Sequence, residues 1–225
     1  MKEKMGTIFV LCTLAFAGIG IGYAHWSEIL TINGSVETGS IDPIFYCVST
    51  NDPTSPGSND PKECGGWDID TTTWDGERYD KNVGAIDASI DPQDSSQLYI
   101  TVTNAYPCYY GSVLFSIKNV GTVPVKIKSI KLVKIDRGDW WKNVNVELDK
   151  DTTYYVDFEA TRVATTPSDG DDFSFSISLI EPGLQIDSDE IKYGDICVHV
   201  EQGAKQNTEY SCVIKVDFWN WNEVM

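Results

Sequence analysis

From Ile86 onward, short runs of alternating apolar and polar residues are separated by glycine, proline and asparagine. The clearest run extends from Phe173 to Leu179 and has serine at every second position. A period of two places alternate side chains on opposite faces of a strand, so each run predicts a β-strand with one buried face. Similar runs occupy 113–117, 196–200 and 210–218, and the first of these ends at a predicted turn, 119–122. The pattern predicts an all-β fold, either a sandwich or a jelly roll.

Two of these segments carry additional information. In 125–135, Lys126 and Lys128 share their parity with the apolar Ile130 and Leu132, which predicts a bulge or a change of exposure midway. The last two runs read as a hairpin whose apolar residues are even-numbered on both strands. Cys212 would then point inward and Cys197 outward, so a disulfide between them would need a bulge.

The chain begins with two lysines and an apolar run from Met5 to Ile21. Gly22 and Ala24 are the small residues that a signal peptidase requires, which predicts an export signal over 1–24 and cleavage between Ala24 and His25. The run is also long enough to remain as a membrane anchor. Cleavage is favoured because no Lys or Arg follows the run before Lys62, whereas stop-transfer helices usually carry flanking charge.

The residues after the cleavage site are strand-like rather than linker-like. The predicted organisation is therefore a signal peptide at 1–24, an N-terminal strand at 25–40 and a β-sandwich domain at 41–225. An acidic loop, 51–81, is inserted into that domain and begins with many residues that break regular structure. A strand at the very end of the mature chain is free to pair with another molecule.

The net charge of the chain is −17, from 17 basic and 34 acidic residues. Such a surface repels nucleic acid and anionic membranes, and nucleic acid is excluded as a partner. It favours divalent cations, or simply solubility.

Acidic residues gather in two loops that are candidates for calcium, because calcium takes several oxygen ligands in flexible geometry. Neither loop matches the EF-hand pattern, and a solvated acidic loop is the alternative for each. The candidate ligands are Asp68, Asp70, Asp75, Glu77 and Asp80 in the inserted loop, and Asp169, Asp171 and Asp172 nearer the C-terminus.

Five cysteines remain after the predicted cleavage. In an exported protein some should pair, and Cys47 and Cys64, which flank a Pro/Asp/Ser loop, are the preferred candidates. An odd count leaves one thiol free or bonded to another chain.

The sequence offers little for catalysis, and we expect no enzyme. Its two histidines are His25, at the new N-terminus, and His199, which alternates with apolar strand residues. A hydrolase triad needs a positioned histidine base, and neither a metal-peptidase motif nor a phosphate-binding glycine loop occurs.

Tryptophans cluster at Trp140–Trp141 and in 218–221, where Trp219 and Trp221 share one strand face. They could form a platform on which sugars stack. Core closure or a subunit contact is the alternative.

Several segments resemble the TasA–camelysin group, especially its archaeal members. The export-and-strand signature carries most of this resemblance. The matching segments are 22–27, 30–39, 105–107, 116–126 and 199–210.

The resemblance implies a jelly-roll domain that assembles into extracellular fibres, in which the N-terminal strand of one subunit completes the sheet of the next. Leu30, Ile32, Gly34 and Val36 share one parity and would face the neighbour's core. The acidic loop and the five cysteines depart from the plainest members of the group, and could add calcium or disulfide cross-links between subunits.

We therefore expect a secreted structural subunit of an extracellular or cell-surface filament, pilus or biofilm matrix. Its partner would be itself, and it would meet the membrane only through the signal segment. The alternative is a monomeric secreted module that binds glycans or calcium, with its N-terminal strand folded into its own sheet. A secreted hydrolase with an unfamiliar carboxylate site is a third possibility.

Overall fold

The computed structural model describes residues 2–24, 38–50, 84–104, 106–138 and 141–222. The chain divides into two compact units, Met1–Thr38 and Gly39–Met225. The first contains the helix α1 (Lys2–Ala24), which covers the predicted signal segment. Among the residues described, no helix combines the length and hydropathy of a membrane span.

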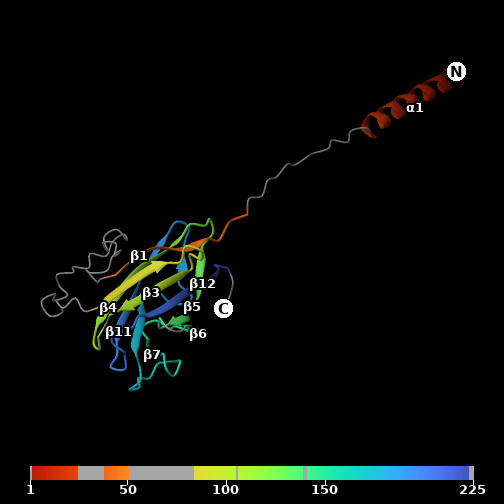
Figure 1. The fold of residues 1–225 in the computed structure, drawn as a ribbon. Coiled ribbons are helices and arrows are strands. Elements are labelled where there is room, and N and C mark those ends of the chain that lie inside the picture. Colours follow the sequence, from red (N-terminus) through yellow and green to blue (C-terminus); the bar gives the residue numbers. More distant parts are fainter. Residues whose placement is uncertain (1, 25–37, 51–83, 105, 139–140, 223–225) are drawn as a thin grey trace. The chain divides into compact units, whose positions relative to one another are not determined.

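The second unit is built from antiparallel strands (Figure 1). Their bounds are β1 (Pro43–Thr50), β2 (Ala85–Ile90), β3 (Gln97–Thr103), β4 (Tyr110–Asn119), β5 (Val125–Asp136), β6 (Trp141–Glu147), β7 (Thr153–Asp157), β8 (Arg162–Ala164), β9 (Phe173–Ser178), β10 (Gln185–Ile186), β11 (Ile191–Val200) and β12 (Tyr210–Asn220).

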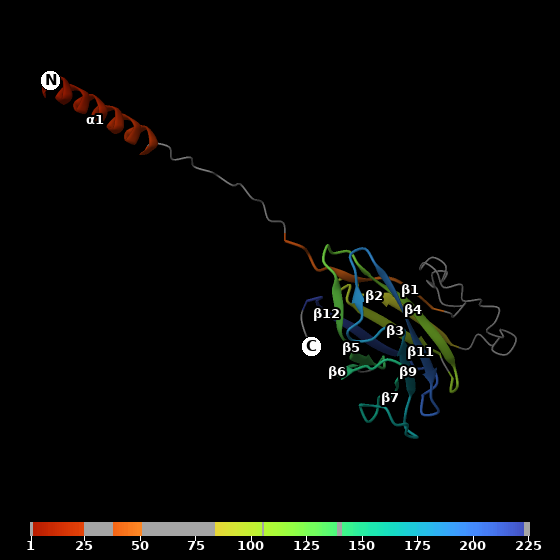
Figure 2. The ribbon, with the colours of Figure 1, turned by 180° about the vertical axis from the view of Figure 1, so that it is seen from behind.

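The strands form two sheets that pack against each other (Figures 1 and 2). Sheet A has the order β1-β4-β11-β9-β7-β8, and sheet B has the order β10-β5-β12-β3-β2, with β6 also paired to β5. Phe115 and Ile196 of sheet A share one buried cluster with Ile130 and Ile214 of sheet B. The predicted all-β sandwich is confirmed.

The two sheets meet at one side through β1 and β2. There the Phe45 N–H donates to the Ser95 carbonyl at 2.8 Å. Because β1 and β2 end their sheets on this side, β6 and β8 lie at the opposite side of the sandwich.

The predicted hairpin between the last two strands is wrong. β11 lies in sheet A between β4 and β9, whereas β12 lies in sheet B between β5 and β3. Even-numbered residues are buried in both strands because the two face one core from opposite sheets. Cys212 is buried in that core, and Cys197 lies on the outer face of sheet A opposite Ser112.

The irregularity predicted in 125–135 is confirmed as two breaks in the register of β5 against β12. Asp217 pairs with Ser129 and Phe218 with Ile127, which leaves Lys128 as the extra residue. A second break leaves Val133 unpaired with β12. Each extra residue shifts the buried parity by one, which is why the lysines of β5 remain outside the core.

The run that starts at Phe173 ends one residue earlier than its alternation predicts. β9 stops at Ser178, and Leu179 is 45% exposed with a φ of 71°. The left-handed backbone at Leu179 turns the chain, so that Ile180 becomes fully buried in its place.

Gly194 makes room for an aromatic ring in the core. It pairs with Phe115, and a Cβ atom at Gly194 would lie 2.1 Å from a carbon of the Phe115 ring. That ring also packs edge-on against Phe45, with 5.3 Å between the ring centroids. An additional methyl group at Gly194 would therefore displace a ring that joins β1, β4 and β11.

We predict that Gly194→Ala lowers the free energy of unfolding by about 1–3 kcal/mol, the usual cost of overpacking a core. Urea denaturation measures the change. Ser178→Ala, on the outer face of β9, is the control and should lie within about 0.5 kcal/mol of the parent. A Gly194→Ala protein as stable as the parent would contradict this account of the core.

Candidate functional site

The N-terminal segment joins the sandwich at the turn between β4 and β5. The Ser40 N–H donates to Thr122 Oγ1 at 3.0 Å, and the Thr122 N–H donates back to the Ser40 carbonyl at 3.0 Å. The backbones approach so closely that a Cβ atom on Gly121 would lie 2.4 Å from the Ser40 carbonyl oxygen. We call residues 39–42 and 119–123 the root of the N-terminal segment.

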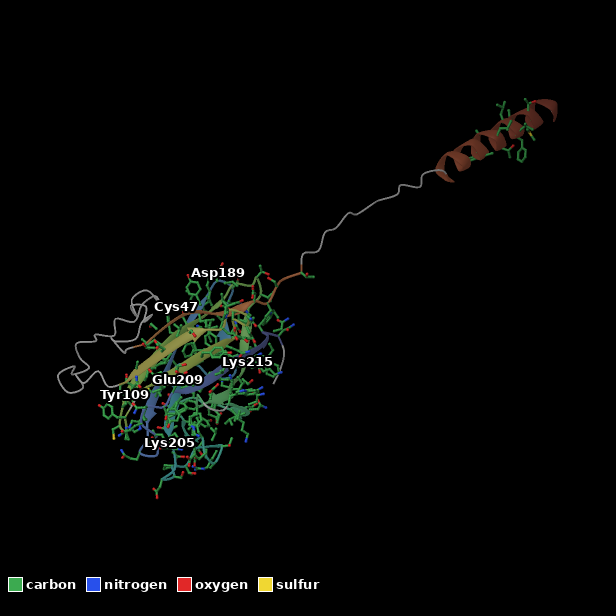
Figure 3. All side chains as sticks on the ribbon, in the orientation of Figure 1. Cys47, Tyr109, Asp189, Lys205, Glu209 and Lys215 are labelled. Atoms are coloured by element: carbon green, nitrogen blue, oxygen red, sulfur yellow. The ribbon has the colours of Figure 1, made fainter. Side chains whose placement is uncertain are left out.

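The root is held from inside by Asn119, which is fully buried. Its Nδ2 donates to the Val123 carbonyl at 2.8 Å, and its Oδ1 accepts from the Gly121 N–H at 3.1 Å. The β10–β11 turn lies beside it, because the Asp189 N–H donates to the Asn119 carbonyl at 2.8 Å (Figure 3). The turn predicted at 119–122 therefore fixes where the chain leaves the sandwich.

The four predicted donor-strand residues, Leu30, Ile32, Gly34 and Val36, lie outside the described residues, as does the cleavage-site residue His25. Residues 38–42 precede β1 and are not part of a strand. The donor strand and the cleavage between Ala24 and His25 stay predictions.

The edge strand β6 has the open geometry that strand addition requires. Within the described chain it pairs with β5 alone, and five of its seven residues are exposed. The Leu148 N–H donates to the Ile130 carbonyl at 2.8 Å. Hydrogen-bonding positions alternate along an antiparallel strand, so the main-chain groups of Glu147 point away from β5 toward the open edge.

Apolar side chains extend the core to this side of the sandwich without being fully covered. Val144 and Val146 of β6 and Val163 of β8 pack against the core cluster but are only partly buried. β6 ends sheet B here and β8, a three-residue strand, ends sheet A. An added strand with apolar residues on one face could cover these valines.

The acidic candidates of the inserted loop, Asp68, Asp70, Asp75, Glu77 and Asp80, lie outside the described residues. Of the second group, Asp169 is exposed, whereas Asp171 and Asp172 are buried. No set of three His, Cys, Asp or Glu side chains in the described part of the chain is arranged to hold a metal ion.

Asp171 and Asp172 are bonded to donors of the protein itself. Asp171 Oδ1 accepts from Arg162 at 2.9 Å, and its Oδ2 accepts from the Ser168 N–H at 2.5 Å. Asp172 accepts from the Phe158 N–H and the Tyr210 hydroxyl, at 2.8 and 3.1 Å. Burial raises the pKa of Asp172, and these two bonds oppose the rise. Both carboxyl groups therefore tie the β8–β9 connection to the core.

A row of polar side chains crosses the outer face of sheet A along β11. We call Asp195, Cys197, His199 and Glu201 the β11 polar row. The Cys197 thiol lies 3.5 Å from Asp195 Oδ2 and 3.6 Å from Ser112 Oγ. The alternation of these residues with core residues was visible in the sequence, but their neighbours on β4 and β9 were not.

Within the β11 polar row, the Cys197 thiol and the His199 imidazole have different partners. His199 Nδ1 lies 2.9 Å from Glu201 Oε1, which also accepts from Ser174 Oγ at 2.6 Å. Burial alone would raise the pKa of Glu201, but the bonds from Ser174 and His199 outweigh it and lower that pKa. A thiol nucleophile requires a base within hydrogen-bond reach; the described contacts of Cys197 include the Asp195 carboxyl group and the hydroxyls of Ser112 and Tyr110.

Asp195 is the member of the β11 polar row whose burial is only partly compensated by hydrogen bonds. Its Oδ1 is buried and has no hydrogen-bond partner among the described residues. Burial raises the pKa of Asp195 above its usual value of 3.8, against opposing hydrogen bonds from Cys197, Ile196 and Ser112. Folding therefore penalises the ionised form of this carboxyl group.

The free cysteines among the described residues are Cys12, Cys108, Cys197 and Cys212, and Cys47 on β1 is not one of them. Cys64 lies outside the described residues, so the pairing of Cys47 with Cys64 stays a prediction. Cys212 is buried, and burial raises the pKa of its thiol to about 12. Cys108 is exposed, in the connection before β4.

Tryptophans from both clusters lie on the outer face of sheet B. Trp141 lies on β6 and is 61% exposed, Trp219 lies on β12, and Trp221 follows the end of β12. Trp140 lies outside the described residues. The sequence placed these residues far apart, and pairing of β5 with both β6 and β12 brings them to one face.

No protein-family model, curated protein or solved structure matches this chain. The resemblance to the TasA–camelysin group therefore rests on the residues of the sequence.

We predict opposite pH responses from two aspartates. A carboxyl group with a raised pKa binds more protons when folded, so stability falls as pH rises through its folded pKa. Asp195→Asn should therefore be more stable than the parent at pH 7, with the difference vanishing toward pH 3. Chemical denaturation at a series of pH values measures both trends.

Asp217→Asn is the matched control. Burial would raise the pKa of Asp217, but its bonds with Lys131 and Ser129 outweigh burial and lower that pKa. Its carboxylate therefore stabilises the fold above its unfolded pKa and loses that effect in acid. This variant should be less stable than the parent at pH 7 and equal to it in acid. If both substitutions raised, or both lowered, the stability at pH 7, the opposite pKa shifts assigned to Asp195 and Asp217 would be refuted.

Proposed function

We propose that this protein is a secreted structural subunit of an extracellular filament, assembled by strand exchange between copies. Residues 30–36 of one copy would add to the open edge of β6 in the next. The observation that carries the proposal is this edge, a seven-residue strand that pairs with β5 alone among the described residues, beside partly buried valines.

The lengths and patterns of the two segments support this pairing. Leu30 to Val36 spans as many residues as β6 and carries its apolar side chains at every second position. Main-chain hydrogen bonds to an open edge supply affinity, and alternate side chains set the register. The apolar face of the added strand would cover Val144, Val146 and Val163.

The position of the root supports a head-to-tail contact that repeats from one subunit to the next. Because it fixes where the N-terminal segment leaves the sandwich, the donor strand and the β6 edge are two different surfaces of one subunit. A contact between two different surfaces is heterologous, and such contacts build open filaments unless they close into a ring.

Two additions to the filament follow from the sequence. The acidic loop 51–81 is the proposed calcium site, with Asp68, Asp70, Asp75, Glu77 and Asp80 as candidate ligands. A disulfide between Cys47 and Cys64 would close this loop, and the exposed Cys108 thiol is available for a bond between subunits. Peptide mapping without reduction tests both cysteine assignments.

The basic test is negative-stain electron microscopy of the protein exported from cells that express the full chain, with calcium and with chelator. Regular filaments support the proposal. Dispersed particles under every condition would contradict it and favour the monomeric alternative.

We predict that Ile32→Asp abolishes filaments, because it buries an unpaired charge between the donor strand and the neighbour's core. Ser35→Asp introduces the same charge on the opposite parity of the segment and should leave assembly intact. Light scattering and microscopy compare the two exported proteins. Equal assembly of both variants would exclude residues 30–36 as a donor strand with this orientation.

We predict that Glu147→Pro blocks assembly by removing the main-chain donor at the open edge of β6. Glu147→Ala removes the same side chain but retains the N–H group, and should assemble like the parent. Urea denaturation of both variants checks that the sandwich itself persists. If a folded Glu147→Pro protein still forms filaments, another edge accepts the donor strand.

A further inference from the structure

The outer face of sheet B concentrates positive charge on an acidic protein. Four of the chain's 17 basic residues fall within 126–134 of β5, and Lys215 joins them from β12, where it pairs with Lys131 (Figure 3). The register breaks of β5 hold these lysines on the outside while its isoleucines and leucine fill the core. We call Lys126, Lys128, Lys131, Lys134 and Lys215, with Trp141 and Trp219, the lysine–tryptophan face.

Neighbouring carboxylates only partly neutralise this face. Lys131 pairs with Asp217 at 3.0 Å, Lys215 with Asp94 at 3.3 Å and Lys134 with Asp136 at 3.5 Å. Lys126 and Lys128 have no ion pair within the described residues. Glu147 of β6 lies opposite Lys131 as a fourth carboxylate, so five ammonium groups meet four carboxylates, which leaves a small local excess of positive charge on a chain whose net charge is −17.

Two lysines of the face stand over indole rings. Lys128 Nζ lies 5.2 Å from the centre of a Trp219 ring, and Lys134 Nζ lies 5.5 Å from the centre of a Trp141 ring. Lys128 and Lys134 are six residues apart on one strand, which corresponds to about 20 Å. The face therefore repeats one unit, an ammonium group over an indole ring, along a line.

The repeated unit matches a sugar ring that carries a carboxylate. The apolar face of a pyranose packs against an aromatic ring, and its carboxylate pairs with the adjacent ammonium group. A nucleic acid offers rings and negative charge as well, but duplex DNA carries one charge per about 1.7 Å. The acidic remainder of this protein would repel so dense a polyanion more strongly than a polymer with one carboxylate per sugar.

We propose that the lysine–tryptophan face binds an acidic polysaccharide, with sugar rings on Trp141 and Trp219 and carboxylates on the lysines beside them. Binding uses the outer face of sheet B and not the edge of β6, so it stands independently of strand exchange. Two units in a line also allow a linear polymer to bind at both ends of the face at once.

The test measures the affinity of the exported full-chain protein for polygalacturonate, with neutral dextran and duplex DNA as comparison polymers. We expect polygalacturonate to bind and dextran not to bind, and affinity to fall at about 1 M salt, where the Debye length is about 3 Å. Failure to bind polygalacturonate, equal binding of dextran, or tighter binding of DNA would overturn the proposal.

Variants locate the site. Lys128→Gln with Lys134→Gln, and separately Trp141→Ala, should each weaken polygalacturonate binding at least about fivefold, the scale of one or two lost contacts. Lys118→Gln is the matched control, because Lys118 also stands over an aromatic ring, Tyr46, but on sheet A. Light scattering and urea denaturation check that every variant has the same assembly state and remains folded.

The control decides the location. Unchanged binding in Lys118→Gln, with loss in the lysine pair, places the polymer on sheet B. Equal weakening in all three proteins would overturn the assignment to this face. The double variant Lys128→Gln with Lys134→Gln changes surface side chains and should fold like the parent. It therefore tests the site even if Trp141→Ala fails to fold.

Discussion

The structure depends on pairing between strands that are far apart in the chain. In sheet A β4 pairs with β11, and in sheet B β5 pairs with β12. Each pair brings the middle of the chain to its C-terminal part, which costs loop-closure entropy before any contact forms. The compensation is one shared core, where Phe158, Phe173 and Tyr210 pack with centroid separations of 5.0–6.4 Å. Burial of these rings on folding offsets the loss of chain entropy.

A shared core leaves two outer faces, and their chemistry differs. The face of sheet A carries serines and the β11 polar row, where Asp195 is held against the cost of burial. The face of sheet B carries lysines whose ammonium groups remain close to solvent and to two indole rings. Lysines are therefore concentrated on sheet B, and this concentration arises where β5 departs from regular pairing at Lys128 and Val133.

The two sides of the sandwich also differ. At one side a main-chain hydrogen bond joins β1 to the turn between β2 and β3, whereas β6 at the other side presents main-chain groups and partly buried valines. An open strand edge is a template for another strand. The root of the N-terminal segment is held by hydrogen bonds of the buried Asn119 and by close backbone contacts of Gly121. A fixed exit point and an open edge are the two requirements of the proposed assembly, and both come from described residues.

The sequence by itself determined the class of the fold and the local features. Alternation of period two predicted the strands, the parity change in 125–135 predicted the irregularity of β5, and residues 119–122 predicted the turn at the root. These features depend on residues that are neighbours in the chain, so local side-chain direction and backbone preference are enough to reveal them. The same alternation gave two wrong predictions. It placed Leu179 in a strand that a left-handed turn ends before it, and it predicted a hairpin for β11 and β12 because their buried residues have equal parity.

Only the tertiary structure decided which strands share a sheet. Parity shows that a residue faces a core but does not show from which side, so β11 and β12 could be separated only by their partners. The same holds for the functional surfaces. Trp141, Lys128 and Trp219 lie on one face because β5 pairs with both β6 and β12, and the Ser112 hydroxyl beside Cys197 comes from the neighbouring strand β4. Such neighbours are set by long-range register, which the order of residues along one strand does not contain.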